Sequence, residues 1–412
     1  MPQLRSLFLD MNSYFASAEQ QLNPALRGKP VAVVPSLTDA TCCIAVSYEA
    51  RPFGVRTGTN VGQARRMCPG LQLVEGRHEN YITLHHQIIK AVETVLPVDE
   101  VCSIDEMHCR LSPQHREVEA ARGLAAEVKR VIAEQVGPYL RCSIGLAPNH
   151  FLGKVASNMQ KPNGLVVITR DDLPNRLYQL ELDDLPGIGR NMLRRLQKCG
   201  IRTMQQLCSL SRKEMREAWK SVVGEQYWLM LRGDQYSSRE TTRRTVGHSH
   251  VLPPKLRTDG GAYAVLVRLL HKAAARLRTM GFLTSRMAIT IKYVGEMPNW
   301  TVKPYVGQVQ DTPTLLNHLN RQWSQRPPGG RPLQAAITLL DLKPAGQISL
   351  PLFEEDRRPC RATEAMDLVN EKLGLNALYF ASMHDTREAA PMRIAFTNIP
   401  DVQAEMSRPV DS

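Results

Sequence analysis

Over the first 170 residues, two kinds of hydrophobic pattern alternate along the chain. Short apolar runs bounded by turn residues are typical of strands, and longer amphipathic runs are typical of helices. We therefore predict an α/β region built on a mostly antiparallel sheet. The predicted strands are 5–10, 30–34, 99–104, 140–146 and 165–169, and the predicted helices are 12–21, 79–95, 116–135 and 150–159. No GxGxxG or Walker-type loop occurs in this region, so nothing in it favours a dinucleotide or P-loop site.

Residues 170–240 are polar and predict short helices separated by turns. Among them, Leu185-Pro186-Gly187-Ile188-Gly189 precedes a basic amphipathic run, which is typical of a helix–hairpin–helix motif. Glycines let the backbone approach a phosphate closely, and the following helix presents free N–H groups to the anion. Such contacts hold DNA without reading its sequence. The alternative is a plain helix connection, because glycine hairpins also join helices in proteins that bind no nucleic acid.

The pattern after residue 240 predicts a second kind of unit. Its order is strand 246–252, helix 261–279, strands 285–293 and 300–308, helix 312–324 and strand 333–342. This order predicts a split βαβ arrangement, a compact sheet with two helices. Beyond about residue 356 the pattern weakens, and the last 55 or so residues are not assigned to a core.

The bulk composition limits the class of protein. At 412 residues the chain is expected to form two to four domains. No apolar stretch approaches the length of a membrane span, and Met1 leads into the first strand without a signal peptide, so no membrane association is expected. The nine cysteines are scattered without a CxxC pair, which favours a reducing cytoplasm over a disulfide framework or zinc ribbon. The pairs His85/His86 and His248/His250 lack a cysteine or carboxylate at ligand spacing, which favours ordinary histidines.

The net charge of +12 is unevenly distributed along the chain. Residues 241–346 contain 15 Lys or Arg and only four acidic residues, which gives this segment a net charge of +11. Clustered cations bind polyanions by releasing condensed counterions, so a phosphate-backbone binder is the simplest interpretation. A basic domain without a nucleic-acid partner is the alternative.

Three carboxylates follow apolar, strand-like runs. Asp10 ends the run that contains Phe8, and Asp105 and Glu106 follow the run 99–104. Burial of a carboxylate is costly unless a cation or a donor compensates it. If the two strands are neighbours, the three side chains converge where hard cations such as Mg²⁺ could bind. The alternative is that both clusters are solvated strand ends.

The motifs together, over about residues 4–355, resemble the Y family of translesion DNA polymerases, closest to the bacterial polymerase IV type. Many matches in the family's own order are more specific than any single motif. In chain order the matching segments are Phe8-Leu9-Asp10 through Phe15-Ala16-Ser17, Arg27-Gly28-Lys29-Pro30-Val31-Ala32-Val33, Ser47-Tyr48-Glu49-Ala50-Arg51 with Phe53-Gly54-Val55, Ser103-Ile104-Asp105-Glu106, Ser143-Ile144-Gly145-Leu146-Ala147-Pro148-Asn149, Lys161-Pro162-Asn163-Gly164 and Pro186-Gly187-Ile188-Gly189.

The resemblance implies an α+β multidomain fold shaped as a right hand. The palm would comprise 1–20 and 76–169, and the fingers 21–75. A thumb with the helix–hairpin–helix would span 170–240, and a DNA-gripping little finger 241–346. A clamp-binding peptide would occupy 347–353, before a tail of unknown role at 354–412.

The resemblance also implies a two-metal centre for phosphoryl transfer. Asp10, Asp105 and Glu106 would be its catalytic side-chain ligands, and Met11 would offer its carbonyl oxygen. Two Mg²⁺ ions are expected, and Mn²⁺ could substitute for them.

For nucleotide binding, the family pattern implies Tyr14, Phe15, Tyr48, Arg51 and Lys161. Phe15 matches the steric gate, where an aromatic ring would clash with a ribose 2′-hydroxyl. Arg51 and Lys161 suit a triphosphate by fork geometry and point charge respectively.

The chain departs from the family pattern at three places. Asn12 stands where many members carry a second aspartate, and Ala45 replaces a usual hydroxyl residue. Met107-His108 replaces a common Ala-Tyr. These changes concern nucleotide affinity and metal preference, and none removes a metal ligand.

Two further sets of residues are predicted to bind macromolecules. The hairpin residues Gly187, Gly189 and Arg190, together with Arg276, Arg278 and Arg286 of the basic segment, are predicted to contact DNA. Gln347-Ile348-Ser349-Leu350-Pro351-Leu352-Phe353 resembles the peptide by which bacterial polymerases dock on a sliding clamp, with Gln347, Leu350, Leu352 and Phe353 as its contact residues. An ordinary loop is the alternative for this segment.

We therefore predict a template-directed DNA polymerase that copies damaged templates with low fidelity. Its partners would be primer–template DNA, deoxynucleoside triphosphates and a sliding clamp, and a monomer in the bacterial cytoplasm near the nucleoid is expected. One alternative is a catalytically silent DNA- and clamp-binding scaffold of the same family. Another is a structure-specific DNA-binding protein, which would leave Asp105, Glu106 and Lys161 without a role.

Overall fold

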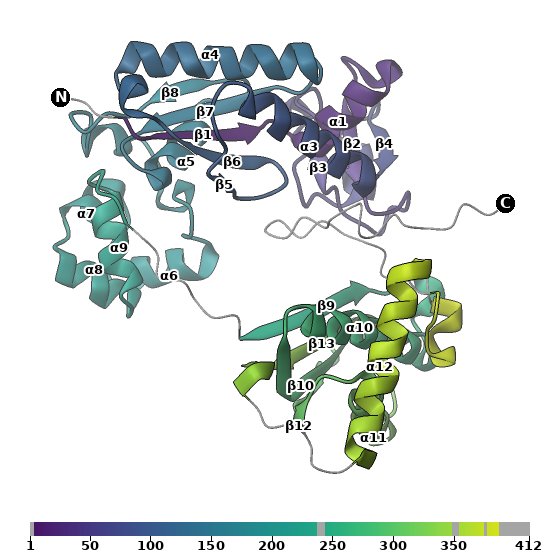
Figure 1. Cartoon of the computed structure of the whole chain (residues 1–412). Coiled ribbons are helices and arrows are strands. Elements are labelled where there is room, and N and C mark those ends of the chain that lie inside the picture. Colours follow the sequence, from purple (N-terminus) through teal and green to yellow (C-terminus); the bar gives the residue numbers. More distant parts are fainter. Residues whose placement is uncertain (1–3, 237–243, 348–353, 375–376, 387–412) are drawn as a thin grey trace. The chain divides into compact units, whose positions relative to one another are not determined.

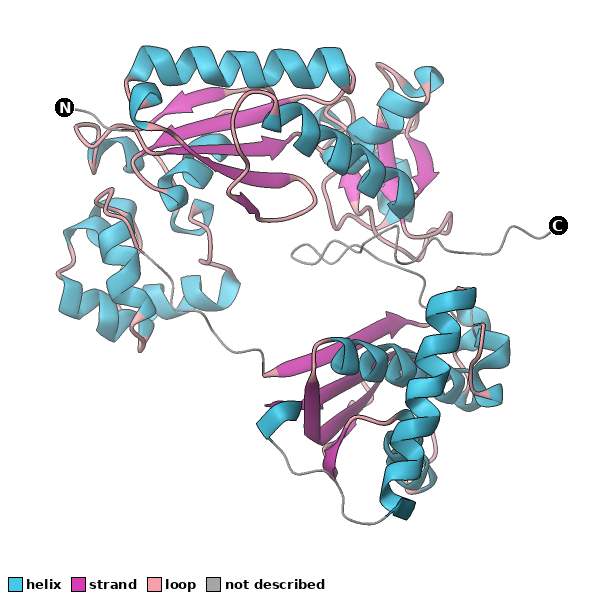
Figure 2. Ribbon diagram, viewed as in Figure 1, coloured by secondary structure: helices cyan, strands magenta, loops and turns pink. Residues whose placement is uncertain are grey.

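A computed structural model describes residues 4–236, 244–347, 354–374 and 377–386. These residues form two compact units, one before residue 238 and one after it (Figure 1). The first unit combines two sheets with a group of short helices, and the second is a single sheet with helices (Figure 2). Among the described residues, no helix is both long and apolar enough to cross a membrane.

A five-stranded sheet in the order β5-β6-β1-β7-β8 is the centre of the first unit. Its middle strand, β1, is flanked on both sides, and all six of its residues are buried, which explains its uninterrupted apolar pattern. Every neighbouring pair is antiparallel except β7–β8, so the prediction of a mostly antiparallel sheet is confirmed. The strands are β1 Ser6–Met11, β5 Glu100–Val101, β6 Glu106–Arg110, β7 Cys142–Ala147 and β8 Leu165–Val167.

The four helices predicted for this region are confirmed. The helix α5 packs against β1 and β7, whereas α4 contacts α3, β7 and β8. The four helices are α1 Tyr14–Leu22, α3 His78–Glu93, α4 Val118–Gln135 and α5 His150–Met159.

The predicted strand 99–104 is wrong in its extent. Residues 100–101 form the short strand β5, a turn follows, and Glu106 begins β6. The two acidic residues therefore lie at the start of the second strand of a hairpin, not at the end of a single strand. The run Glu106–Arg110 alternates intermediate and buried positions, so it has no continuous apolar stretch that would mark it as a strand in the sequence.

Two glycines bring α5 into direct backbone contact with β7. A Cβ atom at Gly145 would lie 2.0 Å from the carbonyl oxygen of Gly153, and one at Gly153 would lie 2.9 Å from Ser6 Oγ. No side-chain layer therefore separates the helix from the sheet at this crossing. The close approach holds the next residue of α5, Lys154, near Glu106 at the start of β6.

A smaller three-stranded sheet, in the order β3-β2-β4, was only partly predicted. The strand β2 is confirmed, but β3 has two residues and β4 is half exposed, so neither stands out in the hydrophobic pattern. The elements are β2 Val31–Val34, β3 Ala45–Val46, β4 Gln72–Glu75, α2 Val61–Met67 and the single turns η1 Pro24–Leu26, η2 Arg51–Phe53 and η3 Pro113–His115, the last of which belongs to the five-stranded region.

Residues 170–236 are helical, as predicted. Two of the helices begin with capping boxes, in which Thr203 pairs with Gln206 and Ser211 with Glu214. Asn149, the N-cap of α5, donates from Nδ2 to the carbonyl oxygens of Met230 and Asp234, which ties the helical region to the large sheet. The helices are α6 Arg190–Lys198, α7 Met204–Ser209, α8 Arg212–Trp219 and α9 Val223–Met230, with the single turns η4 Asn175–Leu177 and η5 Leu182–Asp184.

The second unit has the predicted order of elements. The strands β9 and β10 both run antiparallel to β13, which lies between them, so β9–α10–β10 is a split βαβ unit. The predicted strand 300–308 is interrupted at Lys303-Pro304 and forms two strands. The elements are β9 Thr245–Val251, η6 Pro254–Leu256, α10 Asp259–Thr279, β10 Phe282–Tyr293, β11 Trp300–Val302, β12 Tyr305–Val309, α11 Thr312–Ser324, β13 Pro332–Leu340, β14 Lys343–Pro344 and η7 Ala345–Gln347.

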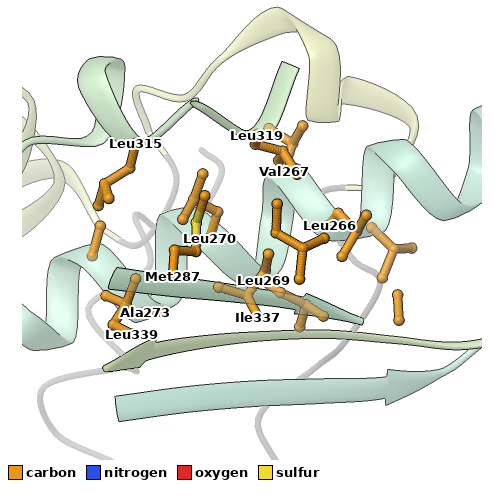
Figure 3. Close-up of a cluster of buried hydrophobic side chains, with 14 of the residues drawn as sticks. Leu266, Val267, Leu269, Leu270, Ala273, Met287, Leu315, Leu319, Ile337 and Leu339 are labelled. Carbon is orange, nitrogen blue, oxygen red and sulfur yellow. The ribbon is translucent and has the colours of Figure 1, made fainter. Parts of the chain in front are cut away.

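The core of the second unit lies between α10 and the sheet. Leu266, Leu269 and Leu270 of α10 pack towards Met287 of β10 and Ile337 of β13, and all five are buried (Figure 3). The C-terminal segment, which the sequence left unassigned, contributes to this unit. Its helix α12 Glu354–Leu373 packs on α11, and Met383 of η8 Ala381–Thr386 is fully buried in the core.

The Gly145–Gly153 contact generates a stability prediction. Gly145→Ala should destabilise the first unit by about 1–3 kcal/mol, because the methyl group meets backbone atoms that have no rotamer to move away. Gly123→Ala is the matched control. Gly123 is an exposed position inside α4 with no atom within 4 Å of its Cβ position, so the same change should stabilise by about 0.5–1 kcal/mol. Denaturant unfolding measures both, and equal effects of the two substitutions would contradict the close approach.

Candidate active site and DNA-binding surfaces

The three predicted carboxylates are brought together by the pairing of β1 with β6. Asp10 and Glu106 are directly opposite each other in this antiparallel pair, and the Met11 N–H donates to the carbonyl oxygen of Asp105 at 2.8 Å. Asp10 is only 6% exposed, and the other two side chains are partly buried. Such a cluster does not match solvated strand ends.

Two lysines and one hydroxyl compensate the negative charge. Lys161 Nζ lies 2.7 Å from Asp10 Oδ2, and Lys154 Nζ lies 2.5 Å from Glu106 Oε2. Asp105 accepts a hydrogen bond from Ser103 Oγ at 2.6 Å. Two ammonium groups face three carboxylates, so the site has one uncompensated negative charge if all of the groups are ionised.

The pKa values of the site reflect this shortage of positive charge. Burial raises the pKa of Asp10 to about 6, and repulsion from Asp105 and Glu106 adds to the rise, whereas Lys161 opposes it. Burial also raises the pKa of Asp105, with Glu106 contributing and the Ser103 hydroxyl opposing. A cation at this point would relieve both effects.

The donor set fits a divalent metal ion. The side chains offer only carboxylate oxygens, which are the ligands that Mg²⁺ and Mn²⁺ prefer. Carboxylates whose pKa values are raised by burial, and further by neighbouring carboxylates, gain most from a bound cation, because the cation favours their charged forms. Asp10, Asp105 and Glu106 could therefore hold such ions, together with the main chain at Met11.

Aromatic rings gather at the start of α1. Phe15 is partly exposed and stacks on Tyr81 at a centroid distance of 4.5 Å, with His78 at its edge. Ser13, just before α1, has a left-handed backbone (φ 50°) that turns the chain sharply after β1. Tyr14 is 3% exposed and donates its hydroxyl to the Tyr81 carbonyl oxygen at 2.6 Å.

The side chain of Tyr14 is therefore not exposed to a nucleotide, and the predicted contact of Tyr14 stays a prediction for its main chain. Its ring is directed into the core, where it supports Tyr81 and so the position of Phe15. A sequence of two adjacent aromatics does not reveal which one is buried.

The predicted phosphate-binding residues Tyr48 and Arg51 form one unit near the same turn. The Arg51 guanidinium lies over the Tyr48 ring at 4.0 Å, and Arg51 Nη2 donates to Ser13 Oγ at 2.8 Å. Ser13 follows Asn12 directly in the chain, so this pair is near the carboxylates. Lys161 reaches the same cluster through Asp10.

The departures from the family pattern have structural roles. Asn12 is buried: its Oδ1 accepts from the Asn163 N–H at 2.7 Å and its Nδ2 donates to Ser143 Oγ at 3.0 Å, so it joins three segments of the large sheet region. Ala45 is buried in β3. His108 contacts His150 edge-on, and burial lowers its pKa to about 4, which keeps the ring neutral at physiological pH.

Sequence reasoning missed Lys154 and Ser103. Lys154 is the only Lys, Arg, Asp or Glu in helix α5, and this single charged residue was the available signal. Ser103 belongs to the matching segment Ser103-Ile104-Asp105-Glu106, but nothing in the sequence indicates that its hydroxyl bonds to Asp105.

Comparison with known proteins supports the resemblance found in the sequence. The family profile described as impB/mucB/samB family matches residues 9–158, and its C-terminal domain matches 243–352. The profile of the DNA polymerase-iota thumb domain matches 183–234. DNA polymerase IV of Moorella thermoacetica is 31% identical over 388 residues, which cover 91% of this chain and 95% of that protein. This chain belongs to the Y family of DNA polymerases.

Other relatives agree with this assignment. DNA polymerase IV 1 of Halalkalibacterium halodurans is 28% identical over 379 residues, covering 89% of this chain and 90% of that protein. A Y-family DNA polymerase chimera of Dbh and Dpo4 has a TM-score of 0.68 at 24% identity, covering 82% of this chain and 99% of that chain, which shows the fold alone. The predicted α+β multidomain polymerase fold and the predicted translesion DNA polymerase activity are confirmed.

The two glycines of the thumb hairpin have different surroundings. Gly187 has a positive φ of 90°, and a Cβ there would lie 2.3 Å from Tyr227 Oη, so glycine is required by the protein itself. Gly189, the N-cap of α6, has no atom within 4 Å of its Cβ position, and Arg190 after it is exposed. Gly189 and Arg190 therefore border open space, where a backbone phosphate could approach the N-terminus of α6.

The three predicted arginines of the little finger have different surroundings. Arg286 lies on β10 with a side chain 55% exposed and 3.5 Å from Asp341. Arg276 lies on α10 and is half-buried. Arg278 is only 9% exposed at its side chain; its Nε and Nη2 donate to both carboxylate oxygens of Asp367 in α12, at 2.6 and 2.7 Å.

The prediction that Arg278 faces DNA is therefore wrong. Its remaining nitrogen, Nη1, donates to the Gln310 carbonyl oxygen and to Thr312 Oγ1, so all three guanidinium nitrogens form hydrogen bonds within the unit. The sequence could not show this, because Asp367 lies in the segment whose pattern was too weak to assign. Of the predicted clamp-binding residues, Gln347 is exposed in η7, and Leu350, Leu352 and Phe353 lie outside the described residues.

The Arg278 contacts generate a stability prediction. Arg278→Ala should lower the unfolding free energy of the little finger by about 1–3 kcal/mol, because Asp367 and two further acceptors lose their donor. Arg286→Ala is the matched control and should change stability by less than about 0.5 kcal/mol, since its side chain is solvated. Thermal and denaturant unfolding of the full chain measure both, and an unchanged transition in Arg278→Ala would contradict the structural role.

Proposed function

We propose that Asp10, Asp105 and Glu106 form the two-metal catalytic centre of this DNA polymerase. The observation that carries the proposal is the convergence of three buried or partly buried carboxylates from paired strands, with fewer cations than anions around them. Relatives in this family are DNA polymerases, which generally use divalent metal ions. When bound, two Mg²⁺ ions, or Mn²⁺ in their place, would activate the primer 3′-hydroxyl and neutralise the triphosphate and the leaving pyrophosphate.

The chain's own residues would bind and orient the substrates. Arg51, held against Tyr48, would hold triphosphate oxygens by its planar fork, and Lys161 would exchange its contact with Asp10 for a phosphate oxygen. Lys154 would orient Glu106 through their ion pair. The face of Phe15 would lie under the sugar, supported from behind by Tyr81, and would exclude a 2′-hydroxyl.

The rival proposal is a catalytically silent DNA- and clamp-binding scaffold. Such a protein has no need to keep three carboxylates crowded at a cost in desolvation. The raised pKa values of Asp10 and Asp105 show that burial disfavours their charged forms, and a bound cation would offset this effect. A structure-specific DNA-binding protein without catalysis is disfavoured for the same reason.

We further propose that the thumb hairpin and the little finger hold primer–template DNA through its phosphates. The segment 241–346 has a net charge of +11, and Arg286 is exposed on its sheet. Binding by phosphate contacts is independent of sequence and weakens with salt. Arg286→Ala should therefore weaken binding evenly across DNA sequences and reduce the slope of log affinity against log salt by about one. The nine cysteines are free in this structure, which fits the reducing bacterial cytoplasm. We expect the protein to act there on DNA as a monomer.

Removal of a catalytic carboxylate should abolish synthesis but not DNA binding. Asp105→Ala and Glu106→Ala are each expected to lower primer extension by at least about 10²-fold, the scale of losing one designed electrostatic contact. The control is Glu119→Ala, a carboxylate on α4 whose side chain is 91% exposed. Primer extension and fluorescence anisotropy of labelled primer–template measure the two properties. Substantial extension by either catalytic variant would refute the metal centre.

Phe15→Ala should admit ribonucleotides, because removal of the ring opens space for the 2′-hydroxyl. The ratio of ribonucleotide to deoxyribonucleotide incorporation efficiency should rise roughly 10- to 100-fold. Phe53→Ala serves as the control, since Phe53 is an exposed aromatic elsewhere in the first unit. If the ratio stays at the parental value in Phe15→Ala, Phe15 is a packing residue only.

We propose that the segment 347–353 docks on a sliding clamp. A short peptide must be ordered on binding, so its affinity should be modest, but tethering raises the local concentration of polymerase at the primer end. Simultaneous replacement of Gln347, Leu350 and Leu352 by alanine should leave extension on bare primer–template unchanged and remove stimulation by loaded clamp. Stimulation equal to that of the parent would make the segment an ordinary loop. Loss of extension without clamp would show that the leucines belong to the core.

A further inference from the structure

Three side chains with ligand atoms of different kinds meet beside the β5–β6 hairpin. Glu100 comes from β5, Cys102 from the turn after it, and His150 from the first residue of α5. A carboxylate oxygen of Glu100, Cys102 Sγ and a ring nitrogen of His150 all lie within 4.8 Å of one another. Within the described part of the chain this is the only group of three His, Cys, Asp or Glu residues with such spacing.

The distance between the cysteine and the histidine fits tetrahedral coordination. Cys102 Sγ lies 3.7 Å from His150 Nε2. With metal–ligand bonds of about 2.3 Å for sulfur and about 2.05 Å for nitrogen, the edge of a tetrahedral zinc site joining them is about 3.6 Å. The two atoms are therefore already separated as they would be around one ion.

The kinds of donor atom select the metal. Thiolate and imidazole are borderline-soft ligands that suit Zn²⁺, whereas Mg²⁺ takes oxygen ligands. Glu100 and His150 are exposed and Cys102 is half-buried, so an ion has access from solvent. This donor set differs from that of the polymerase centre, which offers only oxygen atoms. The two sites are neighbours, because the Cys102 N–H donates to the Glu106 carbonyl oxygen at 2.9 Å.

We propose that Glu100, Cys102 and His150 form a zinc site with one coordination position open to solvent. The site would join the β5–β6 hairpin, which carries Asp105 and Glu106, to the start of α5, which carries Lys154. Its function would be to fix the hairpin relative to α5. His108, whose ring contacts that of His150 at 4.9 Å and which is opposite Glu100 in the β5–β6 pair, would border the site.

The test uses Co²⁺ as a spectroscopic substitute for Zn²⁺ on the full-length, metal-free protein. Excess Mg²⁺ is present throughout so that the oxygen ligands of the polymerase centre are occupied. A thiolate–cobalt charge-transfer absorption reports sulfur coordination, and the intensity of the visible bands reports tetrahedral geometry. We expect about one Co²⁺ per chain with both signatures, and their loss on addition of Zn²⁺.

Variants locate the signal. Cys102→Ser should remove the charge-transfer band, and Glu100→Gln and His150→Gln should each weaken Co²⁺ affinity by about 10- to 100-fold. The control is Cys199→Ser, which removes an exposed thiol in the thumb and should leave the spectrum unchanged. Circular dichroism and thermal unfolding verify that each variant folds. Glu100→Gln keeps the test decisive if the others do not fold, because Glu100 is an exposed residue of the edge strand β5.

Two results would overturn the proposal. One is a parent protein without a thiolate–cobalt band. The other is a band that persists in Cys102→Ser or that is as strong and as tightly bound in Glu100→Gln as in the parent, since the metal would then occupy other cysteines such as Cys42 and Cys43.

Discussion

The electrostatic crowding of three carboxylates is the constraint on which the first unit depends. Asp10 lies on a fully buried strand of the sheet, and its pairing with β6 brings Glu106 and Asp105 beside it. Three residues from the surrounding elements offset the negative charge of the carboxylates. Lys161, which follows α5, pairs with Asp10, Lys154 within α5 pairs with Glu106, and Ser103 in the hairpin turn donates to Asp105. The close crossing of α5 over β7, which only glycine permits, places these lysines within reach. A site that the protein compensates incompletely is prepared to accept cations.

Much of the fold could be predicted because its central elements have strong local signals. The strand β1 is buried on both faces and reads as a continuous apolar run, and the carboxylate at its end is conspicuous for that reason. The strand β6 was misplaced because polar residues alternate along its five positions, so it contains no apolar run like those that mark the other strands. The candidate metal-binding carboxylates could still be named from the sequence, since adjacent acidic residues beside an apolar run need no exact strand boundary.

The residues that escaped prediction depend on contacts between distant segments. Tyr14 and Phe15 are adjacent aromatics, and only the position of Tyr81 decides which of them is buried. Arg278 resembles any other basic residue of a positively charged domain, and only Asp367, 89 residues later, shows that its charge is used internally. The role of Asn12 also depends on distant segments, because its amide bonds to Ser143 and to the Asn163 N–H, and no local sequence pattern indicates these contacts.

The partnership of Arg278 with Asp367 has a consequence for where the little finger ends. The family's C-terminal domain profile stops at residue 352, yet the carboxylate that neutralises this nearly buried guanidinium lies in α12, and Met383 fills part of the same core. The folded second unit of this chain therefore extends beyond the residues that the C-terminal domain profile matches. A fragment cut at residue 352 would retain the arginine without its counter-charge and would expose apolar surface that the full chain covers. In this polymerase, the end of the domain profile and the end of the folded unit do not coincide.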